Sequence, residues 1–161
     1  MNLFDITKGY DFYEDKDVRR GLRLRIDKDV DPFVKSECKK FCKWMRQYYF
    51  FPIRVSLYVK SSPYVKASDG ELVSATFLGP FDKMQEPYIR VSAGDYYEMS
   101  GDLGVESAAF TILRSIAHEI VHYYQWINDL EQSVRVEEWQ ASYYSTRMVN
   151  GYIWDRQNKP Q

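Results

Sequence analysis

The sequence predicts an α+β domain with an N-terminal helix, a small and mostly antiparallel sheet of three or four strands, and two further helices. Two observations support this fold class. Short segments between residues 20 and 92 alternate apolar with polar residues, as half-buried strands do. Other segments repeat apolar residues every three to four positions, as amphipathic helices do. At 161 residues, the chain is expected to form a single domain with a substantial core.

The N-terminal part of the chain has the weakest pattern. Residues 1–20 are polar and aromatic, and we expect them to be irregular, whereas residues 20–27 alternate and predict a short strand. The basic side chains here form either a binding patch or, more commonly, the solvated face of a strand: they are Arg19, Arg20, Arg23 and Arg25. Residues 1–30 are therefore expected to be a peripheral extension, and residues 32–150 the core.

The remaining elements have clearer boundaries. Asp31 and Pro32 are typical of an N-cap followed by proline at the first helical position, and they predict an amphipathic helix over residues 32–48. Its apolar stripe includes Cys38 and Cys42, which we interpret as buried structural thiols. Further strands are predicted at 52–59, 72–78 and 87–92, a loop at 95–104, and helices at 105–128 and 134–150. Gly151 is expected to cap the last helix.

Composition and charge exclude several classes of protein. Lys plus Arg number 22 against 23 Asp plus Glu, which gives a net charge of −1, so we expect no nucleic-acid partner and no anionic membrane surface. Two cysteines are too few for a disulfide framework. The sequence shows neither a signal-peptide pattern nor an apolar run of membrane-spanning length. A cytoplasmic protein is expected, and its oligomeric state is left open.

The most informative stretch is His118-Glu119-Ile120-Val121-His122, because it contains the only two histidines of the chain. Residues four apart share one face of a helix, so both imidazoles can bind one tetrahedral zinc ion. Glu119 flanks that ion without ligating it, which is the position of a general base acting on a zinc-bound water. Such a motif also occurs by chance in helices. Here the histidines occur nowhere else in the chain, and the motif lies in a strong helical pattern, which favours one catalytic zinc ion.

A third protein ligand is needed for a catalytic zinc site. Since no histidine remains, it should be a carboxylate. Asp129 and Glu131 follow the histidine helix too closely to turn back, whereas Glu137 and Glu138 lie on the next helix, which can pack antiparallel to the first. Helix phase favours Glu138 over Glu137, because the small Ala141 shares its face and would allow close helix approach.

Together with Glu138-x-x-Ala141, the histidine motif resembles the gluzincin metallopeptidases, in which the third zinc ligand is a glutamate on the following helix. The resemblance covers about residues 32–150, and its motif region is the specific part. It implies a minimal zincin-like core. Gluzincins often carry Asp or Asn four residues after the ligand glutamate, where it supports a zinc-bound histidine. This chain has Ser142 there, which can hydrogen-bond an imidazole but brings no charge.

The resemblance implies a zinc metalloendopeptidase that hydrolyses peptide bonds of a specific protein or peptide substrate through a Glu-assisted zinc-bound water. It also implies that the substrate pairs as an added strand with residues 73–78 or 88–92. Gluzincins stabilise the oxyanion with Tyr or His, so a tyrosine is implied here. The candidates are Tyr96, Tyr97, Tyr123, Tyr124, Tyr143 and Tyr144. The alternative is a zinc-stabilised binding module with little or no turnover, and the presence of Glu119 favours the enzyme.

Overall fold

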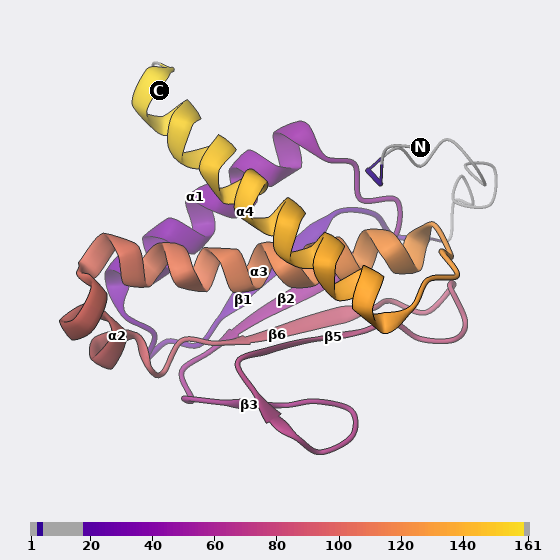
Figure 1. Ribbon diagram of the computed structural model, residues 1–161, viewed down its shortest axis with the longest axis horizontal. Helices are drawn as coiled ribbons and strands as arrows, with labels where there is room; N and C mark the ends of the chain where they lie inside the picture. Colours follow the sequence, from indigo (N-terminus) through magenta and orange to yellow (C-terminus); the bar gives the residue numbers. More distant parts are fainter. Residues whose placement is uncertain (1–2, 5–17, 160–161) are drawn as a thin grey trace.

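The computed structural model describes residues 3–4 and 18–159, and within them the chain folds into an α+β arrangement of four helices, a four-stranded sheet and a two-stranded hairpin (Figure 1). The elements in chain order are β1 (Leu22–Ile26), α1 (Pro32–Tyr48), β2 (Val55–Lys60), β3 (Val65–Lys66), β4 (Leu72–Val73), β5 (Ala75–Leu78), β6 (Tyr88–Ser92), α2 (Tyr96–Leu103), α3 (Val105–Ile127) and α4 (Val134–Asn158). None of the described helices has the length and apolar character needed to cross a membrane.

The main sheet is mixed, with strand order β1-β2-β6-β5. The β1–β2 and β2–β6 pairs are parallel, and only β5–β6 is antiparallel, so the expectation of a mostly antiparallel sheet was wrong. The reason is that chain neighbours are not always sheet neighbours. Helix α1 connects β1 to β2 as a crossover, which allows parallel pairing, and β6 inserts between β2 and β5.

The core lies between the sheet and the helices α1 and α3. The inward-facing residues of β2 and β6, which include Leu57 and Ile89, are fully buried, as are Phe41 of α1 and Ile116 of α3. The N-cap of α1 forms as predicted, because the Asp31 carboxylate accepts hydrogen bonds from the next two free backbone amides. Helix α4 crosses over α3 on the side away from the sheet (Figure 1).

Two helical predictions were wrong. Residues 95–104, which carry two glycines and were expected to form a loop, contain helix α2. Tyr96 of this helix is buried, and its hydroxyl donates to the Val105 carbonyl. Helix α4 does not end before Gly151 but continues to Asn158. Gly151 lies inside the helix beside α1, where an added Cβ would be at ordinary contact distance, 3.5 Å, from the Trp44 ring. The glycine therefore does not terminate the helix.

The described part of residues 1–30 belongs to the core. Strand β1 pairs with β2 along its whole length, and Leu22 and Val30 are buried in the main apolar cluster. Leu3 is buried as well, and its carbonyl accepts a hydrogen bond from the Asn128 amide. This part of the chain is therefore not a peripheral extension. Residues 5–17, for which an irregular structure was expected, lie outside the described residues.

Candidate metal centre

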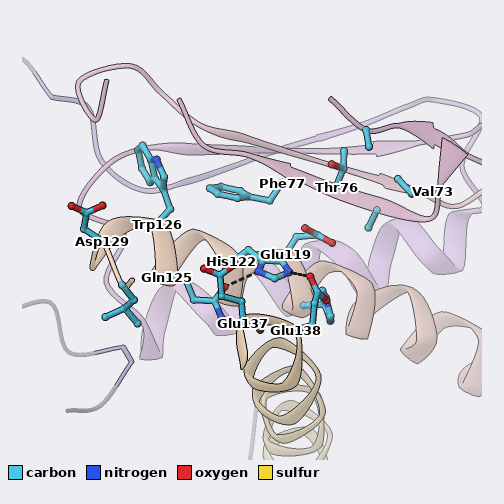
Figure 2. A pocket seen from close by; sticks show the side chains of 14 residues that line it. Val73, Thr76, Phe77, Glu119, His122, Gln125, Trp126, Asp129, Glu137 and Glu138 are labelled. Carbon is cyan, nitrogen blue, oxygen red and sulfur yellow. Dashed lines mark hydrogen bonds and ion pairs between the residues drawn. The ribbon is translucent and has the colours of Figure 1, made fainter. Parts of the chain in front are cut away.

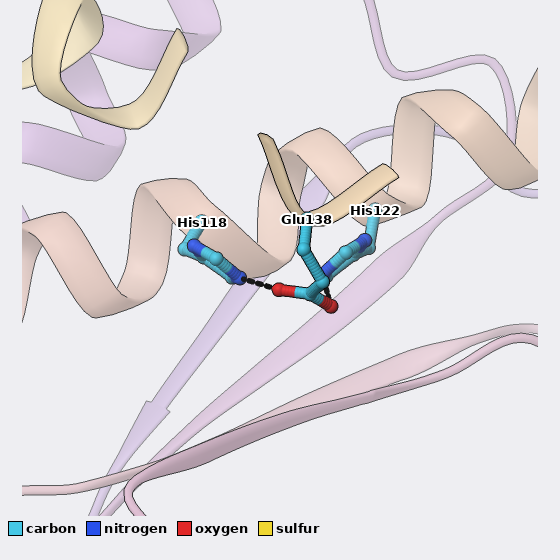
Figure 3. A group of neighbouring side chains, drawn as sticks. All are labelled: His118, His122 and Glu138. Atoms are coloured by element: carbon cyan, nitrogen blue, oxygen red, sulfur yellow. Dashed lines mark hydrogen bonds and ion pairs between the residues drawn. The ribbon is translucent and has the colours of Figure 1, made fainter. Parts of the chain in front are cut away.

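Helices α3 and α4 bring His118, His122 and Glu138 together (Figure 3). The two imidazoles project from one face of α3, as expected from their spacing, with ring centroids 4.9 Å apart. The Glu138 carboxylate of α4 lies between them: Oε2 is 3.0 Å from His118 Nε2, and Oε1 is 3.1 Å from His122 Nε2. Helix phase predicted that Glu138, rather than Glu137, faces the histidines. In the structure, Glu138 is the glutamate that points at both rings.

The three side chains are close enough to hold one metal ion, because one ligand atom from each lies within 4.8 Å of the other two. Two imidazoles and a carboxylate are a donor set that zinc uses in catalytic sites. Burial and the neighbouring His122 lower the pKa of His118, against an opposing effect of the Glu138 carboxylate. A lowered pKa favours the neutral imidazole, which is the form that binds a metal.

Glu119 lies beside these three residues but faces the sheet side of the site (Figure 2). It is buried, with 7% of its surface exposed. Burial, together with the nearby Glu138 carboxylate, raises the pKa of Glu119 to about 7, although His122 acts in the opposite direction. A cation held by the histidines would stabilise the carboxylate and lower this pKa. A carboxyl group so placed can accept and return a proton near neutral pH.

Gln125 supports the site from α3 itself, three residues after His122. Its Oε1 lies 2.7 Å from His122 Nδ1, and its Nε2 donates to the Glu137 carbonyl and to Gln140 Oε1. From sequence alone, a glutamine at this position indicates no more than a local hydrogen bond. The spacing of three on the face that carries His122 was the available signal. Ser142, the expected support, is exposed, and its carbonyl accepts from Ser145 and Thr146.

The site opens into a cavity of about 620 Å³ between α3, α4 and the outer strand β5 (Figure 2). Apolar side chains, among them Phe77 and Trp126, and the acidic Asp129 and Glu137 line it together with the histidines. Strand β5 is the edge of the sheet, whereas β6 is enclosed between β2 and β5. Of the two strands proposed to pair with a substrate, only residues 75–78 therefore have an open edge.

A second cavity of about 430 Å³ adjoins the first, and it shares Ala75, His118 and Glu119 with it. Most of its other lining side chains carry hydroxyl groups. Its only cationic side chain among the described residues is Arg114, which lies one helical turn before His118. Sequence reasoning missed Arg114, because the available signal is again only its spacing of four from a candidate ligand.

None of the six candidate tyrosines lines either cavity. Tyr123 and Tyr124 are fully buried and donate to the carbonyls of Ile53 and Phe50. Tyr97 donates to Asp31, and Tyr143 stacks on the Trp139 ring. The structure therefore brings none of the six candidate tyrosines to the two cavities beside the metal site.

Comparisons of the chain with models of protein families, with curated proteins and with solved structures found no match.

Proposed function

We propose that this chain is a zinc-dependent peptidase of the gluzincin kind, with His118, His122 and Glu138 as zinc ligands and Glu119 as general base. The observation that carries the proposal is the approach of one Glu138 carboxylate to Nε2 of both histidines, at 3.0 and 3.1 Å. The order of a helix, a small sheet, the histidine helix and the glutamate helix supports a minimal zincin-like core.

The residues of the site would divide the chemistry as follows. Bound zinc would supply Lewis acidity, which lowers the pKa of a coordinated water and polarises a carbonyl. Glu119 would take a proton at its carboxylate and deliver it to the leaving amine, and its burial supports both transfers by keeping bulk water from the carboxylate. The open edge of β5 would hold an extended peptide by main-chain hydrogen bonds across the first cavity.

Metal content tests the ligand assignment. The wild-type protein, purified with zinc present and then dialysed, should hold about one zinc per chain by elemental analysis, since three protein ligands define such a site. Glu138→Gln should lose the metal, whereas the matched variant Glu137→Gln should retain it. A wild-type protein that holds no zinc and gains none on titration would remove the basis of the proposal.

Turnover tests the enzyme against the binding module. A quenched-fluorescent peptide library should reveal cleavage by the wild type, and Glu119→Gln should retain zinc but lose at least about a hundredfold in rate. If the wild type binds zinc and cleaves no peptide, the zinc-stabilised binding module is the better account. If Glu119→Gln cleaves as fast as the wild type, Glu119 is not the base.

A further inference from the structure

The outer edge of β1, at the opposite side of the sheet from the metal site, carries a cationic groove. Two adjoining cavities of about 280 and 510 Å³ follow this edge, and they share Arg25 and Arg46. Every charged side chain that lines them among the described residues is a cation. These are Arg20, Arg23, Arg25, Lys28, Lys35, Lys39, Arg46 and Arg54.

This clustering is unusual for a chain with a net charge of −1, from which no nucleic-acid partner was expected. Eight of the 22 Lys and Arg residues gather in the groove. Within the described part of the chain, Arg23 and Arg54 form no ion pair, and Arg23 Nε is buried without a hydrogen-bond partner. Like charges this close repel one another, so a bound anion would stabilise the arrangement.

Aromatic rings adjoin the part of the groove formed by Arg23 and Arg25, on the sheet face opposite α1. In the sheet register Arg25 is next to Tyr58, and Tyr58 is next to Arg90, so the three side chains share one face. The Tyr58 and Tyr88 rings are 6.4 Å apart, and the Arg90 guanidinium lies 4.8 Å from the centre of the Tyr88 ring. Both tyrosines are partly exposed.

We propose that this groove and the adjoining tyrosines bind a single-stranded nucleic acid. Arginine guanidinium groups match phosphate oxygens in bidentate geometry, and a five-residue strand of about 17 Å can follow several successive phosphates. Partly exposed aromatic rings next to a cationic track are the arrangement on which unpaired bases stack. An acidic peptide would use the cations but not the rings.

The charged edge also has a purely structural explanation. Cations on an edge strand prevent sheets from pairing edge to edge, and Arg46 and Arg25 do donate to the backbone carbonyls of Leu22 and Leu24. That explanation accounts for the two arginines that donate to backbone carbonyls. It does not require six further cations around two cavities, nor tyrosines beside them. It predicts no binding of nucleic acid, so the two accounts can be separated.

Fluorescence anisotropy with labelled 20-nucleotide dT and rU strands tests the proposal on the whole protein. Binding should weaken as salt rises, with a slope of log K against log salt of about −0.7 for each phosphate contacted. A 20-base-pair duplex and a polyglutamate chain should bind at least tenfold more weakly. Chelator-treated protein should bind the strands equally well, because the groove is remote from the metal site and the proposal does not depend on zinc.

Variants locate the surface. Arg23→Gln with Arg25→Gln should weaken binding at least tenfold and reduce the salt slope by about 1.4, whereas the matched pair Lys40→Gln with Lys43→Gln, on exposed residues of α1 outside the groove, should have little effect. Tyr58→Leu should weaken binding about tenfold without changing the slope. No binding at 50 mM salt, equal loss in both double variants, or preference for duplex or polyglutamate overturns the proposal. Thermal melts establish that each variant is folded, and Tyr58→Leu tests the surface even if the arginine pair is needed for folding.

Discussion

Gln125 and Glu138 hold His122 from opposite sides of its ring. The Gln125 Oε1 atom lies 2.7 Å from Nδ1, and the Glu138 Oε1 atom lies 3.1 Å from Nε2. Because Gln125 Nε2 is used in donating to the Glu137 carbonyl and to Gln140, its oxygen is the atom left to face the imidazole. His122 must then donate from Nδ1, which leaves the Nε2 lone pair directed at the candidate metal position.

The first prediction concerns this hydrogen bond. Gln125→Ala should weaken zinc binding about 10–100-fold, because the imidazole loses the partner that fixes its tautomer and orientation. Competition with a chromophoric chelator measures the affinity. Ser142→Ala is the control, at the position where gluzincins often carry an acidic residue, and it should bind zinc as the wild type does. Equal affinities for Gln125→Ala and the wild type would contradict the role given to Gln125.

A second prediction, which rests on the proposed peptidase activity, concerns Arg114. Arg114 lines the second cavity with His118 and Glu119, where no candidate tyrosine lies, and its guanidinium is the cationic donor there for a developing oxyanion. Arg114→Gln should retain zinc and lower kcat about 100-fold with little change in KM. Arg135→Gln, an exposed residue of α4, is the control for charge. A kcat that is unchanged in Arg114→Gln would exclude this role.

Much of the fold could be predicted because local patterns determine it. The apolar periodicity of α1 and α3 and the Asp31-Pro32 start gave these helices nearly residue by residue. Strand pairing could not be predicted in the same way, since the insertion of β6 between β2 and β5 depends on contacts distant in sequence. The extension of α4 past Gly151 likewise depends on α1: Tyr152 and Arg156 both bind the buried Glu37 carboxylate.

The candidate site was predictable where helix geometry is sufficient. The spacing of His118, Glu119 and His122 fixes their relative directions on any helix, and the same argument separated Glu138 from Glu137. The donor to the oxyanion could not be predicted in this way. The fourteen tyrosines of the chain could not be ranked from the sequence, and the structure brings none of the six candidates to the two cavities. Residues distant in sequence that line one cavity, such as Arg114 and Ala75, have no common sequence signal.

The third prediction concerns the ion pair that joins α1 to the end of α4. The Glu37 side chain is only 2% exposed, and Arg156 lies 2.7 Å from its carboxylate. Arg156→Met should lower the free energy of unfolding by about 3 kcal/mol, because it leaves a buried charge whose one remaining partner among the described residues is the Tyr152 hydroxyl. Chemical denaturation measures the change.

The control lies less than one helical turn further on. Lys159 pairs with Asp155 at 3.3 Å, but its side chain is 53% exposed. Lys159→Met should therefore change the free energy of unfolding by no more than about 1 kcal/mol. Equal losses in Arg156→Met and Lys159→Met would show that burial of Glu37 does not determine the effect.

The fourth prediction concerns the two thiols, which the structure places in the core as expected. Cys38 and Cys42 are fully buried on α1. Burial raises the pKa of Cys42 to about 12 and that of Cys38 further, so almost no thiolate exists at pH 8. The native protein should therefore not react with a thiol-specific chromogenic reagent, with or without zinc, whereas the denatured chain should give two thiols. Fast reaction of native protein after zinc removal would instead place a cysteine at the metal site.

The last prediction concerns Asp27, which joins the ends of β1 and β2. Its carboxylate accepts a hydrogen bond from the Ser61 backbone amide at 2.9 Å, and this bond, followed by Lys60, holds the pKa of Asp27 below its ordinary value. A lowered pKa in the folded state means that the ionised form stabilises the fold at pH values above the ordinary value of about 3.9, and that this stabilisation is lost as pH falls through the lowered pKa.

Asp27→Asn should therefore cost about 1 kcal/mol in unfolding free energy at pH 7, and the difference from wild type should shrink below pH 4. Urea denaturation at pH 7 and at pH 3 measures both values, and a difference that grows on acidification would reverse the sign of the assigned pKa shift.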